Sequence, residues 1–323
     1  MKTYAKYLLL AMLVCVPTWI EPAAGQTASA PTASRPERWR QRRLFPVRWV
    51  RVPDSLPDGV RHETFHSKAM NCDVGYCIAT PPGYADGQTR YPVLYLLHGL
   101  GGNELTYRKH LERLHEAMAN GQIPPLIAVA VNGGSATMYC DSVDGTILPD
   151  TMIIRELIPH IDSQYRTISS RQGRIIEGFS MGGFGALKFA FKYPELFCAV
   201  VGGAPALLEW DRVTSERHAE MASRMYANDR EAFESEHPRT WLKKNADKIR
   251  GKLRIRIMIG DQDGLKAYND AFRKLMDELE IPYEYEVVEG VGHSSGRVYA
   301  KLGTDGLRFH AAVLEHAREV NQK

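Results

Sequence analysis

The pentad from Gly178 to Gly182 constrains this chain more than any other stretch, because it places Ser180 between two glycines. It follows an apolar pair, Ile175-Ile176, and opens a helix-like segment from Gly183 to Lys192. A serine at such a strand-to-helix junction can be held in a sharp, exposed turn, where a β-carbon on either flank would clash. About 0.1 pentads of this kind are expected by chance in a chain of 323 residues, so its context decides its meaning.

The amino-terminal end predicts an export signal. A basic start, Met1–Lys6, precedes an apolar core, Tyr7–Val16, and the small residues of Pro22–Gly25. The apolar run is well short of the ~20 residues that a membrane span needs, although a buried helix or an uncleaved anchor is the alternative. We therefore expect residues 1–25 to be a cleaved signal peptide and the mature protein to be secreted or periplasmic, with no integral membrane span.

Residues 26–55 are basic and are expected to be a flexible linker before a single domain over residues 56–323. With 44% hydrophobic residues, the chain can bury one large core. The net charge of +3 is too small to imply a nucleic-acid partner, and we expect none. Contact with an anionic lipid, a cell-wall polymer or a nucleic acid is the alternative role for the arginines of this segment, which are Arg35, Arg38, Arg40, Arg42, Arg43, Arg48 and Arg51.

Four cysteines remain after removal of the leader, namely Cys72, Cys77, Cys140 and Cys198. An exported protein can oxidise them, and one pairing would join Cys72 to Cys77 across a hairpin and Cys140 to Cys198. Four unpaired thiols are equally compatible with the sequence. No spacing resembles a zinc site, and no metal is expected.

Apolar runs alternate with helical segments from about Tyr76 onward, which is typical of an α/β fold with a mainly parallel sheet covered by helices on both faces. The runs are continuous, so we expect central strands buried on both faces. They cover residues 92–97, 126–131, 174–177, 197–201 and 255–259. Helices are expected over residues 104–119, 150–165, 183–193, 265–279 and 305–320.

The interval 207–252 contains no strand-like run. Its helical pieces, 214–226 and 239–249, predict an insertion over the carboxyl edge of the sheet, where open α/β sheets bind ligands. Trp210 and Met221 could line a substrate cleft there, although packing in the core is the commoner role for such residues.

Catalysis by Ser180 would require a histidine as base and a carboxylate to orient it, because a neutral hydroxyl is a poor nucleophile. In hydrolases built on such a sheet, the acid and the base follow the serine along the chain. His293 follows a strand and a glycine-rich loop, residues 287–292, and is predicted as the base. The other histidines after the serine lie in helical segments; they are His218, His237, His310 and His316.

Two carboxylates compete for the role of the acid. The run 255–259 ends in Gly260-Asp261-Gln262-Asp263-Gly264, which places both at the tip of one strand. Periodicity does not separate Asp261 from Asp263, and a turn or helix-capping role is the alternative for either.

The negative oxygen that forms during acyl transfer needs two backbone N–H donors. Met181, directly after the serine, supplies the first. The glycine-rich loop His98–Gly102 is placed to supply the second through Leu100. His98 itself is expected to fix this loop rather than to act as a second base. This chemistry requires no cofactor.

Several motifs occur in a fixed order: Tyr91–Gly99, Asp141-Ser142, Glu156–Pro159, Tyr165-Arg166 and Gly178–Gly183. Together they resemble the esterase D-like branch of the α/β-hydrolases, from about Glu63 to the carboxyl terminus. That branch includes feruloyl and acetyl-xylan esterases, S-formylglutathione hydrolases, siderophore esterases and mycolyltransferases. The resemblance implies an α/β-hydrolase fold and places Leu100 and Met181 at the oxyanion hole.

The same resemblance implies that Asp263 is the triad acid, because the family has a Gly-x-x-Asp pattern that matches Gly260–Asp263. One departure concerns the residues after His293. The family often has an acidic and an aromatic residue there, whereas this chain has Ser294–Arg297. A substrate preference taken from the aromatic-acid esterases is therefore open.

The function implied is that of an exported serine carboxylic-ester hydrolase that forms an acyl-enzyme, acting on acylated polysaccharide of the feruloyl or acetyl type or on a smaller ester. An S-formylglutathione hydrolase-like thioesterase fits the motifs but not the leader. Acyl transfer to a sugar is a further alternative. A hydrolase fold used only for binding would be favoured by a missing triad member, and none is missing. The oligomeric state is open.

Overall fold

The computed structural model describes residues 44–303 and 305–321. The predicted signal peptide and the first part of the predicted linker, residues 26–43, lie outside the described residues. The described residues form one compact unit. No helix of the described part is both long and apolar enough to cross a membrane.

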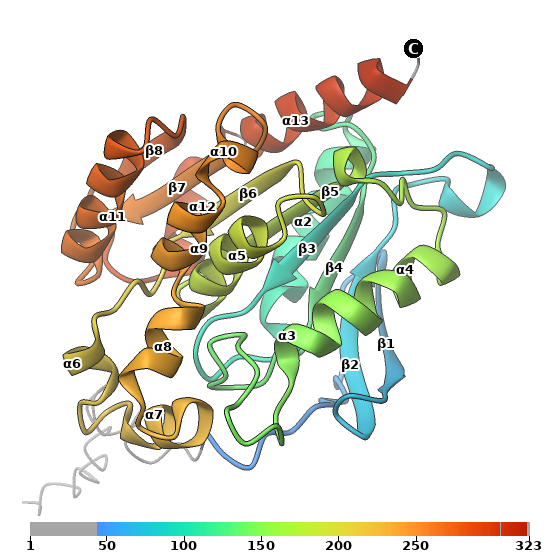
Figure 1. The fold of residues 1–323 in the computed structure, drawn as a ribbon. Coiled ribbons are helices and arrows are strands. Elements are labelled where there is room, and N and C mark those ends of the chain that lie inside the picture. Colours follow the sequence, from blue (N-terminus) through green and yellow to red (C-terminus); the bar gives the residue numbers. More distant parts are fainter. Residues whose placement is uncertain (1–43, 304, 322–323) are drawn as a thin grey trace, which may run out of the picture. The chain divides into compact units, whose positions relative to one another are not determined.

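An eight-stranded sheet forms the centre of this unit, in the order β1-β2-β4-β3-β5-β6-β7-β8 (Figure 1). Strands β3 to β8 pair in parallel, whereas β1 pairs with β2 and β2 with β4 in antiparallel fashion. The strands are β1 (Val60–Ser67), β2 (Cys72–Ala79), β3 (Val93–Leu97), β4 (Ile127–Val131), β5 (Arg174–Phe179), β6 (Ala199–Gly203), β7 (Arg254–Gly260) and β8 (Glu284–Val288). The predicted fold class is therefore confirmed.

The five apolar runs correspond to the central strands β3 to β7, each within a few residues of its predicted bounds. The sheet begins earlier than Tyr76, however, with the hairpin β1–β2. Strand β1 lies at the edge of the sheet and mixes buried with exposed residues, and its buried Val60 and Phe65 enter different cores. It therefore has no continuous apolar run.

Two cores form, one on each face of the sheet, because successive side chains of a strand point to opposite faces. On β3, Val93, Tyr95 and Leu97 enter one core, and Leu94 and Leu96 enter the other. The first core is covered by α4 (Ile158–Gln164), α5 (Met181–Lys192), α11 (Lys266–Glu278) and the insertion. The second is covered by α2 (Arg108–Ala119), α12 (Ser295–Leu302) and α13 (Asp305–Asn321).

Each predicted helix is present, with local differences. The first consists of a 3-10 turn, η2 (Glu104–Tyr107), followed by α2. The helix predicted over 150–165 consists of α3 (Pro149–Thr151), a π-helical segment η3 (Met152–Leu157) and α4. Helix α12 was not predicted. Shorter 3-10 turns are η1 (Tyr84–Asp86) and η4 (Arg171–Gly173).

The insertion after β6 consists of short helices beyond the ends of the strands and beside α5 (Figure 1). They are α6 (Trp210–Val213), α7 (Ala219–Tyr226), α8 (Arg230–Glu236), α9 (Pro238–Lys244) and α10 (Ala246–Ile249). Lys188 of α5 is fully buried and donates to Asp150 at 2.8 Å and to Glu236 of α8 at 3.0 Å. Met221 lies in the core and the Trp210 ring packs on Phe233, so both residues have packing contacts.

The described part of the predicted linker packs on the domain and is not free. Residues 44–51, here called the amino-terminal strap, place Phe45 in the core. Within the strap, Trp49 accepts a hydrogen bond from the N–H of Gly75, and the Arg51 N–H donates to the buried carboxylate of Glu104. The compact part of the chain therefore begins before residue 56.

The four cysteines Cys72, Cys77, Cys140 and Cys198 are free thiols in the structure. Cys72 and Cys77 lie on the same extended strand, about 16 Å apart at the usual rise of a strand. A disulfide needs Cα atoms within about 7 Å, so these two do not staple a hairpin. Cys140 and Cys198 contact the two different cores, on opposite faces of the sheet, and cannot pair either.

Three buried histidines predict that the protein loses stability in mild acid. Burial lowers the pKa of His98 and of His110 to about 4, and that of His237 to about 3. The unfolded chain takes up a proton at each near pH 6.5, whereas the folded state does so only near pH 4 or below. Stability should therefore fall as the pH drops from 6.5 towards 4, by up to about 1.4 kcal/mol per pH unit for each histidine.

Urea unfolding at pH 7, 6 and 5 measures this slope. Replacing buried His237 with Gln should reduce it, because the folded state then holds one neutral histidine fewer. A midpoint that stays constant from pH 7 to pH 5 would contradict the prediction.

Candidate active site

Ser180 lies between β5 and α5 in a backbone conformation, φ 61° and ψ −118°, that non-glycine residues rarely adopt. The Ser180 N–H donates to the carbonyl oxygen of Gly203 at 2.7 Å. A β-carbon on Gly178 would lie 2.1 Å from the carbonyl oxygen of Gly182, and one on Gly182 would lie 1.8 Å from that of Leu97. The predicted steric need for both glycines is confirmed.

His293 follows β8 on a short loop and contacts both other members of the predicted triad. Its Nε2 is 2.9 Å from Ser180 Oγ, and its Nδ1 is 2.8 Å from Asp263 Oδ2. The histidine side chain is 41% exposed, whereas the Asp263 carboxylate is fully buried. The ring also packs on Phe179, with 5.1 Å between centroids. The structure thus joins the three residues in one hydrogen-bonded series.

The two competing carboxylates have different contacts. Asp263 Oδ2 lies at His293, and its Oδ1 accepts the N–H of Leu265 at 2.9 Å. Asp261 Oδ1 instead accepts the N–H of Val291 at 3.2 Å. Asp263 therefore orients the imidazole, while Asp261 holds the loop that carries His293.

The loop His98–Gly102 passes beside the serine. A β-carbon on Gly99, the residue before Leu100, would lie 3.4 Å from the Cβ of Ser180, so the backbone of this loop lies directly against the serine. On the other side, Met181 is the first residue of α5, and the first N–H groups of a helix have no intrahelical acceptor. Met181 thus directly follows Ser180, and Leu100 follows the glycine that lies against it; the role of both in an oxyanion hole stays a prediction.

His98 fixes the conformation of this loop. Its buried Nε2 accepts the N–H of Gly133 at 3.1 Å, so the proton is on Nδ1, which donates to the Gly99 carbonyl at 2.9 Å. Burial keeps the ring neutral by lowering its pKa to about 4. His98 is bonded to backbone groups and not to Ser180, which agrees with the predicted loop-fixing role.

A second loop supports the first and was missed from the sequence. The Ser135 carbonyl accepts the N–H of Gly101 at 2.6 Å, and the Ser135 hydroxyl donates to the carbonyl of Leu44 in the strap at 2.5 Å. The side-chain amide of Asn132 donates to the Arg48 carbonyl in the strap at 2.9 Å and to the Glu104 carboxylate at 2.7 Å. In the sequence, Asn132 and the glycines Gly133 and Gly134 follow an apolar run, as His98 and Gly99 do. This repeated pattern could have predicted that a second loop lies beside the His98 loop.

The motif Asp141-Ser142 has a local role. Asp141 accepts the N–H groups of Asp150 at 2.8 Å and Thr151 at 3.2 Å, which caps the start of α3. Ser142 donates to Asp144 at 2.6 Å within a turn. Both contacts favour the turn role over a direct part in the site.

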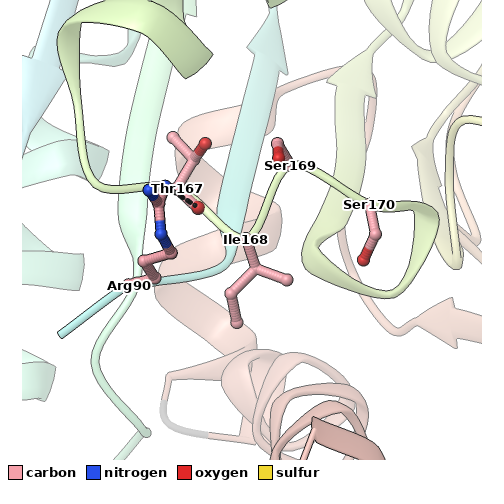
Figure 2. A pocket seen from close by; sticks show the side chains of 5 residues that line it. All are labelled: Arg90, Thr167, Ile168, Ser169 and Ser170. Atoms are coloured by element: carbon pink, nitrogen blue, oxygen red, sulfur yellow. Dashed lines mark hydrogen bonds between the residues drawn. The ribbon is translucent and has the colours of Figure 1, made fainter.

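One surface cavity of about 440 Å³ lies away from the serine (Figure 2). It is lined by Arg90, Thr167, Ile168, Ser169 and Ser170, which precede β3 and β5 and so lie at the amino edge of the sheet. Ser180 follows β5 at the carboxyl edge. Among the described residues, no group of three or more His, Cys, Asp or Glu is arranged to hold a metal ion.

Comparison with known proteins shows which family the chain belongs to. The family model described as "Putative esterase" matches residues 67–303. An esterase of Mycobacterium tuberculosis is 36% identical over 151 residues, which are 46% of this chain and 32% of that protein. An endo-1,4-beta-xylanase/feruloyl esterase of Xylanibacter ruminicola is 33% identical over 147 residues, covering 43% of this chain and 20% of that protein. The chain therefore spans about a third or less of these relatives.

Solved structures share the fold along most of the chain. A ferulic acid esterase superposes with a TM-score of 0.68 at 24% identity, covering 79% of this chain and 98% of that one. An S-formylglutathione hydrolase from Agrobacterium tumefaciens gives 0.67 at 19% identity, covering 80% and 98%. Because the family model matches most of its length, the chain belongs to the esterase family that this model describes, and it shares the fold of these solved esterases and hydrolases.

Proposed function

We propose that this protein is a serine carboxylic-ester hydrolase that forms an acyl-enzyme on Ser180. The observation that carries the proposal is the series of hydrogen bonds from Ser180 Oγ through His293 to Asp263, at 2.9 and 2.8 Å. These distances allow the imidazole to remove the hydroxyl proton as the oxygen attacks, and a buried carboxylate stabilises the resulting imidazolium.

The reaction would proceed in two halves. Ser180 Oγ attacks the ester carbonyl while His293 Nε2 takes its proton, and the backbone N–H groups of Leu100 and Met181 stabilise the negative oxygen. The tetrahedral intermediate collapses, and His293 returns the proton to the leaving alcohol. Water then enters and attacks the acyl group while His293 removes its proton. The second tetrahedral intermediate collapses, the acid leaves, and His293 returns the proton to Ser180 Oγ.

For the substrate, we propose an acylated polysaccharide of the feruloyl or acetyl type, encountered outside the cytoplasm. The Xylanibacter relative is named an endo-1,4-beta-xylanase/feruloyl esterase, and another relative is an acetyl esterase of Caldicellulosiruptor saccharolyticus. The sequence of the leader supports export to the secreted or periplasmic space. A thioesterase or an acyltransferase would use the same acyl-enzyme and differs only in the group that donates or accepts the acyl chain.

A panel of esters tests both the proposed ester hydrolysis and the proposed substrate class. Acetyl, feruloyl and longer-chain esters and a formyl thioester are ranked by kcat/KM, with and without a sugar acceptor. We expect acetyl or feruloyl esters to exceed the formyl thioester at least about tenfold, since a few well-placed pocket contacts supply that much discrimination. A best rate with the thioester, or acylated sugar as the main product, would favour the corresponding alternative.

The same protein treated with an aryl sulfonyl fluoride should gain one covalent group on the peptide that contains Ser180. A protein that turns over none of the esters and leaves this peptide unmodified would be a binding module and not an esterase.

A further inference from the structure

A buried carboxylate lies three residues before the serine. Glu177 belongs to β5, and its side chain is on the same face of the sheet as Phe179, the ring that packs on His293. It is fully buried and follows the apolar pair Ile175-Ile176, and an unpaired charge at such a position would be costly. The catalytic scheme above uses no group at this position, so the carboxylate needs another explanation.

Glu177 joins the serine strand to both carboxyl-terminal helices. Its Oε1 accepts a hydrogen bond from the Tyr299 hydroxyl of α12, and its Oε2 is 2.7 Å from His310 Nε2 of α13. The ring of His110, from α2, stacks on Tyr299 with centroids 4.4 Å apart. One carboxylate therefore connects β5 to α12 and α13.

The charge states support these bonds. Burial alone would raise the pKa of Glu177, but the adjacent His310 and the Tyr299 hydroxyl lower it to about 2, so the carboxylate is ionised at neutral pH. Burial, together with the negative charge of Glu177, raises the pKa of Tyr299 well above its ordinary value. Tyr299 thus stays protonated and donates to an ionised acceptor, which is a strong form of hydrogen bond.

Helix α12 begins directly after His293. Ser294 caps it, since its hydroxyl accepts the N–H of Arg297 at 3.4 Å and its carbonyl accepts that of Val298 at 3.0 Å. The helix has only eight residues, and Val298 is its one fully buried side chain. Tyr299 and Leu302 pack against the same core, and the Arg297 side chain donates to the Gly290 carbonyl at 3.1 Å. The bond from Tyr299 to Glu177 adds a direct polar link between this short helix and the serine strand.

We propose that Glu177 is a positioning residue for His293, which it acts on through Tyr299 and α12. Holding α12 against β5 sets the distance between His293 Nε2 and Ser180 Oγ, because both reacting groups are then fixed to the same strand. The inference rests on the proposed esterase function. It adds a further support for the histidine, besides Asp263, the Phe179 ring and the loop contact of Asp261.

The test uses Glu177→Ala and Tyr299→Phe in the full chain, assayed with p-nitrophenyl acetate at a temperature where each variant is folded. Each change should lower kcat about tenfold and leave KM within about twofold, because a misplaced base slows chemistry without removing a substrate contact. The sulfonyl fluoride should label Ser180 more slowly by a similar factor. The double variant should lose no more than the worse single one, since both changes break the same link.

Two further variants separate positioning from general stability. Glu177→Gln should retain most of kcat, because its amide oxygen can still accept the Tyr299 hydroxyl. Glu63→Ala is the matched control. Glu63 also accepts two tyrosine hydroxyls, from Tyr76 at 2.8 Å and Tyr165 at 2.6 Å, but it lies on β1, with three strands between it and β5. It should leave kcat and the labelling rate unchanged.

If Glu177→Ala does not fold, Tyr299→Phe alone decides, since it removes one hydroxyl and keeps the ring. Unchanged kcat and labelling rate in a folded variant, even with a lower melting temperature, would overturn the proposal. This result is distinguishable from failure of the esterase function, in which the unmutated protein itself would neither hydrolyse the ester nor react with the sulfonyl fluoride.

Discussion

Replacing Ser180 with alanine should lower kcat/KM for p-nitrophenyl acetate by a factor on the order of 10⁵, because the change removes the nucleophile and leaves water as the only attacking group. The oxyanion donors remain, so a small residual rate above the uncatalysed reaction is expected. Alanine keeps the β-carbon, and the turn is set by Gly178 and Gly182, so the fold should be unaffected. Initial rates and a thermal melt of the same preparations measure both effects.

Ser235→Ala is a suitable control for this change. Ser235 lies in α8 with its hydroxyl on the Ala232 carbonyl, and it contacts no residue of the site. The control should keep its rate within about twofold, in line with the small effects of surface substitutions. An S180A protein that retains more than about one per cent of the activity would mean that another residue carries the acyl group.

The features that the sequence predicted correctly depend on short stretches of chain. The serine turn requires glycines at fixed positions, and these can be read directly because Gly182 contacts the backbone of Leu97 at a distance that excludes a side chain. The central strands are continuous apolar runs, since both of their faces are buried. The order of the serine, acid and histidine then follows from the order of the strands.

The features that were missed depend on contacts between distant residues. Glu104 was assigned to a helix, but its side chain binds Arg51 and Asn132, which lie 53 and 28 residues away. The strap shows no pattern of its own because it contributes mainly backbone groups. Glu177 was visible as a charge within an apolar run, but its partners lie 122 and 133 residues further along the chain. No local period connects such positions.

The choice between Asp263 and Asp261 required the structure for the same reason. Both follow one strand, and their roles differ only in which side of the loop each carboxylate faces. Asp263 accepts two hydrogen bonds, one per oxygen, from His293 Nδ1 and from the Leu265 N–H. Asp261 has its contact with the backbone of Val291.

Asp263→Asn should therefore lower kcat/KM about 10³-fold or more, through the tautomer of His293. The Leu265 N–H requires the amide oxygen of the new asparagine, which forces its NH₂ group towards His293 Nδ1. The imidazole must then accept at Nδ1 and carry its proton on Nε2, where it can no longer take the proton of Ser180.

Asp261→Asn should cost less than about tenfold, because an amide oxygen can still accept the N–H of Val291 and hold the histidine loop. Kinetics of both variants on p-nitrophenyl acetate at pH 8 give the comparison, and a thermal melt verifies that each is folded. At residue 263, the contacts with Leu265 and His293 fix the orientation of the new amide, whereas Asp261 contacts neither residue. The geometry therefore predicts a larger loss of activity in Asp263→Asn than in Asp261→Asn. A larger loss in Asp261→Asn would reverse the assignment of the acid and with it the hydrogen-bonded series on which the mechanism depends.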